Sequence, residues 1–207
     1  MTARARARRP AVGRTPRARA PRPLSDPPYR VVSARATGKA LVATRPIALG
    51  EAVASWAGAR LLRRPTWQSV QVSERRHAED PRSLNLLNHA CAPNVSIDIP
   101  RRRVIALRRI RPGEVLAFFY PSTEWSMARP FPCHCGSKRC LHEVRGARDL
   151  PLATLRRAPL SAHVRRLKRS QVKRAHSSKL TAVPCPALHP APGAAVPTRR
   201  RAAGGRS

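Results

Sequence analysis

The sequence is short of acidic residues and of long apolar runs, and each shortage narrows what the protein can be. Ten Asp and Glu stand against 42 Lys and Arg, giving a formal net charge of +32. Such a charge repels free basic peptides and favours acidic partners, or basic partners already bound to nucleic acid. No apolar run has the length of a membrane-spanning helix, so we expect no membrane partner.

The N-terminus lacks the apolar segment of a secretory signal. Its Arg-rich, acid-free composition would suit an organelle transit peptide, but the prolines in residues 10–23 would break the amphipathic helix of such a peptide. Cysteine is scarce and odd in number, with five residues. We therefore expect an intracellular protein with reduced thiols, cytoplasmic in a bacterium or, as an alternative, nuclear in a eukaryote.

Acidic residues are confined to the middle of the chain. All ten lie between Asp26 and Asp149, together with 21 of the 42 basic residues. The other basic residues lie in flanking stretches rich in Arg, Ala and Pro, so we expect disordered tails in residues 1–28 and 177–207. Tails of this charge suit non-specific nucleic-acid binding. Cys185, alone in the second tail, is expected to be inert.

The middle of the chain predicts a mostly β fold. Several short stretches alternate apolar and polar residues and are separated by turn signals. They are residues 29–34, 40–45, 51–58, 69–73, 95–99, 102–110 and 114–120. Two turns, "PIALGEAV" and "RIRPGEVL", share an Ile, two residues and Gly-Glu, so Gly50 and Gly113 are expected to adopt positive φ. The best helical stretch is 152–169, which Pro159 interrupts.

Three of the five cysteines crowd into "FPCHCGSKRC", residues 131–140. Cys133, Cys135 and Cys140 cannot all form one disulfide, whereas zinc takes about four nitrogen or sulfur ligands. The spacing alone leaves the fourth ligand open, and the candidates are Cys91, His134, His142 and His89. Three buried reduced thiols without metal are the alternative.

Two further stretches carry polar residues that could form a site. "LLNHACAPNV" places Asn88 beside His89, two residues before Cys91. "AFFYPS" is an apolar strand that ends at Tyr120. By themselves, a structural histidine and a strand-end tyrosine with its hydroxyl in water would explain both.

Together these stretches resemble SET-domain protein lysine methyltransferases that carry a post-SET zinc motif. Residues 88–94 resemble the NHSCxPN signature, and residues 106–120 resemble the AxRxIxxGEELxxxY segment that follows it. Residues 131–140 resemble the post-SET CxCxxxxC motif, and residues 33–51 resemble the start of the domain. The four occur in the order of the family.

The resemblance implies a SET domain of short strands over residues 29–128 and a zinc-bound post-SET segment over 129–146. A basic helical extension over 147–176 would follow. In the family, the cysteine of the NHSC motif completes the trio, which implies zinc held by Cys91, Cys133, Cys135 and Cys140. S-adenosylmethionine would be bound by Gly38, Lys39, Asn88, His89 and Phe131.

The implied function is transfer of a methyl group from S-adenosylmethionine to a lysine of a protein substrate. The amine must be neutral to attack, and a narrow apolar channel favours the neutral form. Tyr120 matches the tyrosine that orients the reactants in the family. No acidic residue is needed at the reaction centre under this reading.

Departures from the pattern keep an alternative open. Ala40 replaces a glycine, Ala90 replaces a serine, and Phe119 replaces the Asp that usually precedes the tyrosine. The stretch 59–85, where the family selects its substrate, is short. The alternative is a catalytically inactive SET-like basic module that binds nucleic acid.

Overall fold

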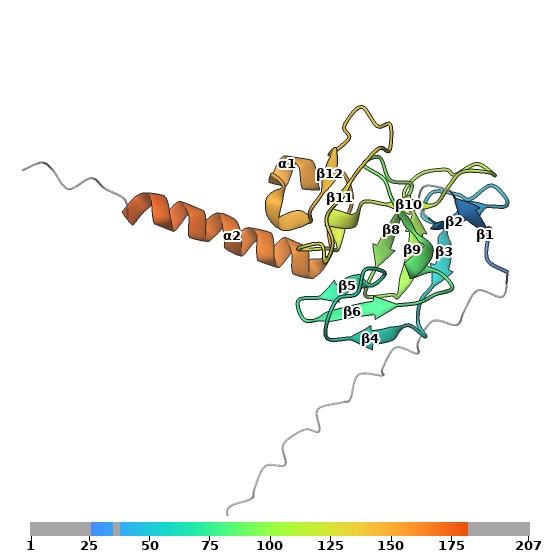
Figure 1. The fold of residues 1–207 in the computed structure, drawn as a ribbon, viewed down its shortest axis with the longest axis horizontal. Coiled ribbons are helices and arrows are strands. Elements are labelled where there is room, and N and C mark those ends of the chain that lie inside the picture. The colour runs from blue at the N-terminus through green and yellow to red at the C-terminus, as the bar shows by residue number, and fades with distance from the viewer. Residues whose placement is uncertain (1–25, 35–37, 182–207) are drawn as a thin grey trace, which may run out of the picture.

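The computed structural model describes residues 26–34 and 38–181 and shows a β-rich body from which one long helix projects (Figure 1). The tails predicted at 1–28 and 177–207 lie largely outside these described ranges, as does Cys185. The strands are β1 Tyr29–Ala34, β2 Gly38–Ala43, β3 Ala52–Ser55, β4 Arg60–Leu62, β5 Val70–Ser73, β6 Arg76–Glu79, β7 Asn88–His89, β8 Val95–Asp98, β9 Arg103–Ala106, β10 Ala117–Phe118, β11 Phe131–Pro132 and β12 Glu143–Val144.

These strands form five small sheets. β1 pairs antiparallel with β2, and β11 pairs antiparallel with β12. Two three-stranded sheets have the orders β3-β9-β8 and β4-β6-β5. β7 and β10 form a short parallel pair. The mostly β architecture that the sequence predicts is confirmed.

The predicted strands are mostly found, but the structure shortens several of them and adds others. The stretch 114–120 is reduced to β10, because Val115 forms only an isolated bridge to Val42 and Tyr120 begins the 3-10 helix η2, Tyr120–Ser122. β4, β6, β7, β11 and β12 were not predicted. These strands are too short or too polar to show an alternation of apolar and polar residues. β6 is stabilised by pairing with both β4 and β5.

The two look-alike turns pack against each other. Gly50 has φ 79° and Gly113 has φ 86°, as expected for tight turns into a strand. The N–H of Ile47 donates to the carbonyl of Ile110 at 3.0 Å, and the N–H of Ile110 donates back to Ile47 at 3.0 Å. The repeated pattern therefore has a physical counterpart, a reciprocal bridge that joins the start of the domain to its end.

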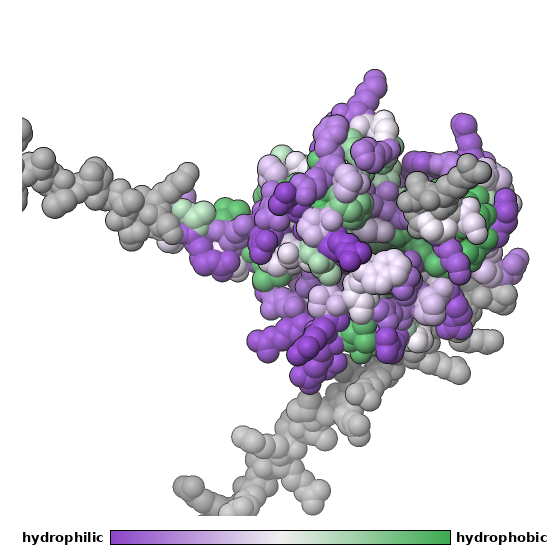
Figure 2. Space-filling model, in the orientation of Figure 1, coloured by the Kyte–Doolittle hydropathy of each residue, from purple (hydrophilic) through white to green (hydrophobic). Residues whose placement is uncertain are grey.

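The main core is aliphatic. Fully buried residues from β2, β3, β8 and β9 form one cluster with the Ile pair of the two turns. Leu41, Val53, Val95 and Val104 are essentially inaccessible to solvent. On the face shown in Figure 2, hydrophilic residues cover most of the surface and hydrophobic residues appear only in patches. This core supports the strands that carry the sequence motifs.

The C-terminal part forms a second, smaller core. It contains the 3-10 helix η3 Ala147–Asp149 and the helices α1 Leu152–Leu155 and α2 Ala162–Thr181; a third 3-10 helix, η1 Leu84–Leu86, precedes β7 and packs in the main core. The single interrupted helix predicted at 152–169 is thus two helices around Pro159, and the second continues past residue 176, where the helical extension was expected to end. Lys168 ties α2 to η3 by donating to the carbonyls of Ala147 and Arg148, at 3.2 and 3.1 Å. None of the helices described has the length and hydrophobicity needed to cross a membrane.

Candidate functional site

The parallel pairing of β7 with β10 brings two distant motifs together. Asn88 lies opposite Ala117, and His89 lies opposite Phe118. The side chain of Asn94 fixes this junction, because its Nδ2 donates to the carbonyl of Val115 and its Oδ1 accepts from the N–H of Ala117, both at 2.8 Å. The Pro-Asn end of the first motif therefore has a structural role, and Tyr120 is held just beyond the junction.

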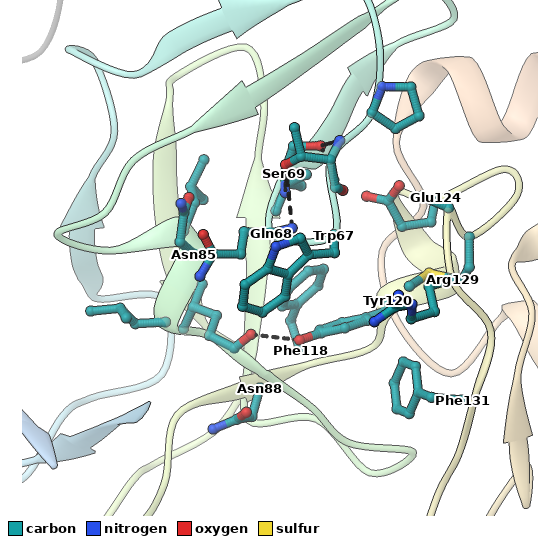
Figure 3. Close-up of a pocket in the computed structure, with 18 of the residues that line it drawn as sticks. Trp67, Gln68, Ser69, Asn85, Asn88, Phe118, Tyr120, Glu124, Arg129 and Phe131 are labelled. Atoms are coloured by element: carbon teal, nitrogen blue, oxygen red, sulfur yellow. Dashed lines mark hydrogen bonds between the residues drawn. The ribbon is translucent and has the colours of Figure 1, made fainter. Parts of the chain in front are cut away.

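A pocket of about 630 Å³ opens at this junction (Figure 3). Five residues predicted from the sequence line it: Gly38, Lys39, Asn88, Tyr120 and Phe131. The Asn88 amide lies 3.5 Å from the carbonyl oxygen of Lys39, to which it donates. The volume of the pocket lies within the range typical of small-molecule sites. The structure therefore gathers predicted residues from four separate stretches of the chain around one space.

Tyr120 lies in the wall of the pocket with its hydroxyl engaged. The hydroxyl donates to the carbonyl of Leu87 at 2.8 Å. Its ring packs on Phe118, with centroids 4.7 Å apart, and meets Phe131 edge-on at 5.9 Å. Burial raises the pKa of Tyr120 above its ordinary value, so the hydroxyl stays protonated at neutral pH and acts as a hydrogen-bond donor.

His89 is the exception among the predicted cofactor residues, because it does not line the pocket. Its Nδ1 accepts from the backbone N–H of Tyr120 at 3.2 Å, so a neutral ring carries its proton on Nε2. Nε2 lies 3.3 Å from Sγ of Cys91. Burial lowers the pKa of His89 to about 4, which keeps the ring neutral. The ring therefore links the tyrosine to the cysteines and does not line the pocket.

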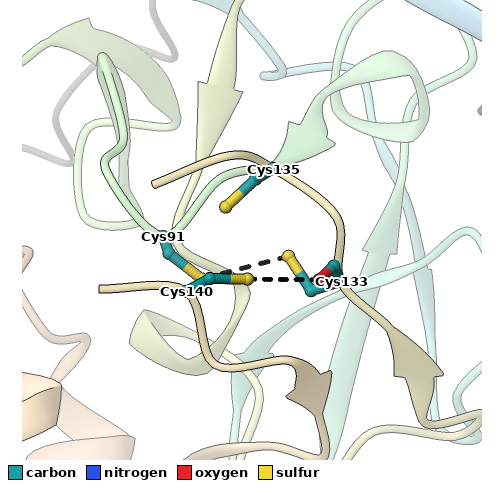
Figure 4. A group of neighbouring side chains, drawn as sticks. All are labelled: Cys91, Cys133, Cys135 and Cys140. Atoms are coloured by element: carbon teal, nitrogen blue, oxygen red, sulfur yellow. Dashed lines mark hydrogen bonds between the residues drawn. The ribbon is translucent and has the colours of Figure 1, made fainter. Parts of the chain in front are cut away.

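Four cysteines converge on one another (Figure 4), and one of them, Cys91, contacts the His89 ring. The Sγ atoms of Cys91, Cys133, Cys135 and Cys140 all lie within 4.8 Å of one another, and those of Cys91 and Cys133 are 4.0 Å apart. All four are free thiols. A tetrahedral zinc with bonds of about 2.3 Å would place its sulfur ligands at about this separation. The donor set therefore fits one zinc ion.

The candidate histidine ligands do not join this group. The cluster contains only cysteines among the described residues, and His134 and His142 are both exposed. The cysteine loop is anchored where Cys133 donates its N–H to the carbonyl of His142 at 2.8 Å. β11 and β12 flank this loop, and β11 carries Phe131 into the pocket. A metal at the cysteines would thus fix one wall of the pocket.

Three departures from the family pattern have plain structural places. Ala40 is buried within β2, and Ala90 is half-buried and donates its N–H to the carbonyl of Phe118 at 3.0 Å. Phe119 is fully buried in the second core, against Leu155 and other apolar residues. A large apolar side chain at this position therefore anchors the C-terminal helices to the domain.

Sequence reasoning missed several pocket residues. Trp67, Gln68, Ser69 and Glu124 also line the pocket. The first three belong to the stretch 59–85, which was expected to select the substrate. The sequence did not indicate which residues of that stretch would line a pocket. Glu124 could have been noticed as one of only ten acidic residues, four positions after Tyr120. An acidic residue therefore lines the pocket, although none was singled out from the sequence.

The sequence is similar to known proteins over the stretch that carries these motifs. Residues 38–121 match the family model described as SET domain. "Methyltransferase flvH" of Aspergillus flavus is 39% identical over 104 residues, which cover 49% of this chain and 58% of the relative. The match thus spans little more than half the length of that relative.

Solved structures give weaker likenesses. The crystal structure of KRYPTONITE in complex with mCHG DNA and SAH has a TM-score of 0.45 at 20% identity, covering 56% of this chain and 28% of that one. The methyltransferase domain of human histone-lysine N-methyltransferase SETMAR has a TM-score of 0.44 at 17% identity, covering 57% of this chain and 58% of that one. On the strength of the family match, the chain contains a SET domain, in residues 38–121.

Proposed function

We propose that this protein is an S-adenosylmethionine-dependent methyltransferase that acts on a protein lysine. One observation carries the proposal: the residues that the family uses for cofactor and catalysis gather around a single pocket, although they come from distant parts of the chain. The family match and the name of the curated relative, a methyltransferase, support the reaction class. The assignment of a protein lysine as the methyl acceptor is based on the resemblance of the motifs to those of protein lysine methyltransferases.

The residues that would hold S-adenosylmethionine lie at one end of the pocket. In the view of Figure 3, Asn88 and Phe131 are at this end, and Phe118 and Tyr120 lie between them and Glu124. Phe131 offers an aromatic face and Asn88 offers a side-chain amide. S-adenosylmethionine, when bound, supplies a methyl group on a positively charged sulfur. We propose that Gly38 and Lys39 contribute backbone contacts to the same ligand.

The chain's own residues would then position the acceptor. Tyr120, held by Leu87 and by the rings of Phe118 and Phe131, is a fixed donor at the middle of the pocket. Such fixed groups accelerate a reaction by aligning the reactants, because the entropy of alignment is lost on folding rather than at each turnover. The apolar rings also exclude water from the amine.

Cofactor binding gives the direct test. Isothermal titration of the full chain with S-adenosylmethionine should show about one site. Asn88→Ala should weaken binding by roughly tenfold, the loss expected for about 1.4 kcal/mol of hydrogen bonding. Asn85→Ala is the matched control and should bind the cofactor as wild type does. Asn85 also lines the pocket, but its side-chain oxygen accepts a hydrogen bond from the backbone N–H of Asp80. A wild-type chain that binds no cofactor would contradict the methyltransferase proposal and favour the inactive SET-like module.

We propose that zinc is structural. The four cysteines supply all four positions of a tetrahedron and leave none for a reacting water. Burial raises the pKa of the Cys91 thiol to about 11, so metal binding must displace its proton. The ion would hold β11 and β12, and through them Phe131, beside the pocket.

Nucleic-acid binding is a second candidate function, favoured by the basic residues outside the acid-containing middle of the chain. Counterion release predicts non-specific binding to duplex DNA that weakens steeply with salt. Removing residues 1–25 and 182–207, which lie outside the described ranges, should abolish most of this binding and leave S-adenosylmethionine binding unchanged. The measurement is DNA affinity at several salt concentrations. Binding that is independent of salt, or unchanged by the truncation, would contradict the idea.

A further inference from the structure

Glu124 is a buried acid without a positive partner among the described residues of a strongly basic protein. Eight of the ten acidic residues form an ion pair with an arginine: Glu51, Glu74, Glu79, Asp80, Asp98, Glu114, Glu143 and Asp149. Asp26 is exposed. Glu124 is only 6% exposed, and no ion pair reaches it from the part of the chain that the structure describes. A buried carboxylate normally needs such a partner.

The carboxylate is held rigidly by one oxygen. Oε1 accepts from the backbone N–H of Gln71 at 2.6 Å and from Oγ1 of Thr123 at 3.3 Å. The Gln71 side chain in turn accepts from the N–H of Trp125 at 2.8 Å, which fixes this part of the chain. Oε2 accepts no hydrogen bond from any described residue, and Glu124 lines the pocket, with its carboxylate pointing into it in Figure 3. One oxygen is therefore positioned by the fold and the other is open to a ligand.

The aromatic walls of the pocket suit a cation that carries an apolar chain, although two basic residues, Lys39 and Arg129, also line the pocket. The protein has only three Trp, two Tyr and three Phe, and four of these line this one pocket: Trp67, Phe118, Tyr120 and Phe131. Aromatic faces attract cations and also bind hydrocarbon. Burial raises the pKa of Glu124 to about 7, so an appreciable fraction is ionised at neutral pH, and a bound cation would favour the charged form further.

We propose that Glu124 binds the cationic amine of the methyl acceptor, as the anionic anchor of an alkylammonium site in this pocket. The bound amine then transfers a proton to the Glu124 carboxylate, because only the neutral amine can attack a methyl group. The proposal rests on the proposed methyltransferase function and names a residue that selects its acceptor. Glu124 lies beyond Phe118 and Tyr120 from Asn88 in Figure 3, on the side away from the proposed cofactor end. The acceptor amine would therefore enter from the side of residues 65–70, where Trp67 is 77% exposed.

The test is binding of n-butylammonium, with n-butanol as the neutral molecule of the same shape, measured by saturation-transfer NMR on the full chain at physiological salt. Wild type should bind the cation at least about tenfold more tightly than the alcohol, the preference expected from one charge-assisted hydrogen bond. Without a local anionic group, a protein of net charge +32 would repel the cation, so a preference for the cation indicates such a group. No preference for the cation in wild type would overturn the proposal, whatever the variants show.

Glu124→Gln removes the charge but keeps an oxygen acceptor for the Gln71 N–H. It should lose the preference for n-butylammonium and bind n-butanol as wild type does. Glu74→Gln, which makes the same change at an acid paired with Arg166, should behave as wild type. Equal weakening of both molecules in Glu124→Gln would mean a structural role only, which overturns the proposal. Nα-acetyl-lysine methylamide distinguishes a peptide lysine from a free amine, because it should bind more tightly than n-butylammonium if the site serves a protein.

S-adenosylmethionine titration keeps this proposal separate from the proposed function. If the cofactor binds but Glu124→Gln retains the preference for the cation, the acceptor assignment fails and the methyltransferase proposal stands. If the cation preference depends on Glu124 but no cofactor binds, the amine site stands and the methyltransferase proposal fails.

Discussion

Cys91→Ser is expected to abolish zinc binding and, with it, most of the affinity for S-adenosylmethionine. Metal analysis of wild-type protein should give about one zinc per chain. Of the four proposed ligands, Cys91 alone lies outside the short cysteine loop, so its loss should disconnect that loop from the junction of β7 and β10. Phe131 depends on this anchorage, because β11 and β12 share only two residue pairs. We expect cofactor affinity to fall by roughly ten- to a hundredfold, equivalent to about 1.4–2.8 kcal/mol.

The rest of the domain should survive this substitution. The main core contains none of the four cysteines, so the circular dichroism of the strands should change little. Cys185→Ser, outside the described ranges, is the control and should retain both zinc and cofactor. Full zinc content in Cys91→Ser would instead assign the fourth ligand to another side chain, with the exposed His142 and His134 as the first to test.

The sequence predicts the strands well where one face of a strand is buried. β8 begins where expected, because its Val95 and Ile97 lie in the main core and the alternation of its residues reports that burial. β1 also lies where expected, although its Val31 is half-exposed. The pair β7 and β10 is different, since each strand has only two residues and exists through a contact between distant positions. No local pattern records such a pairing. Only the resemblance of the flanking motifs placed Asn88 and Tyr120 in one site.

Side-chain roles were harder to predict than positions. Asn88 and His89 are adjacent, yet one lines the pocket and the other turns its ring between Tyr120 and Cys91. Successive residues of a strand point to opposite faces, but which face holds the pocket is decided by the tertiary fold. Glu124 shows the same limit. Its lack of a cationic partner among the described residues is visible only in the tertiary structure.

The last expected result separates catalysis from binding. Tyr120→Phe should bind S-adenosylmethionine within about a factor of two of wild type, because its ring and its packing on Phe118 remain. Methyl transfer should fall by about a hundredfold, since the hydroxyl would act mainly by aligning the reactants in the transition state. Labelled S-adenosylmethionine, offered with a whole-cell extract, measures the transfer as labelled protein bands.

The chain supplies its own control for the lost hydroxyl. Its other tyrosine, Tyr29, donates to the carbonyl of Arg82 at 3.2 Å, much as Tyr120 donates to Leu87. Each Phe variant loses one such hydrogen bond, which costs about 1 kcal/mol of stability. Tyr29→Phe should therefore show a comparable fall in melting temperature with full methyl transfer. If Tyr120→Phe labels proteins as well as Tyr29→Phe does, the hydroxyl at the centre of the pocket only supports the fold, and the alignment of the amine must come from Glu124 and the aromatic walls.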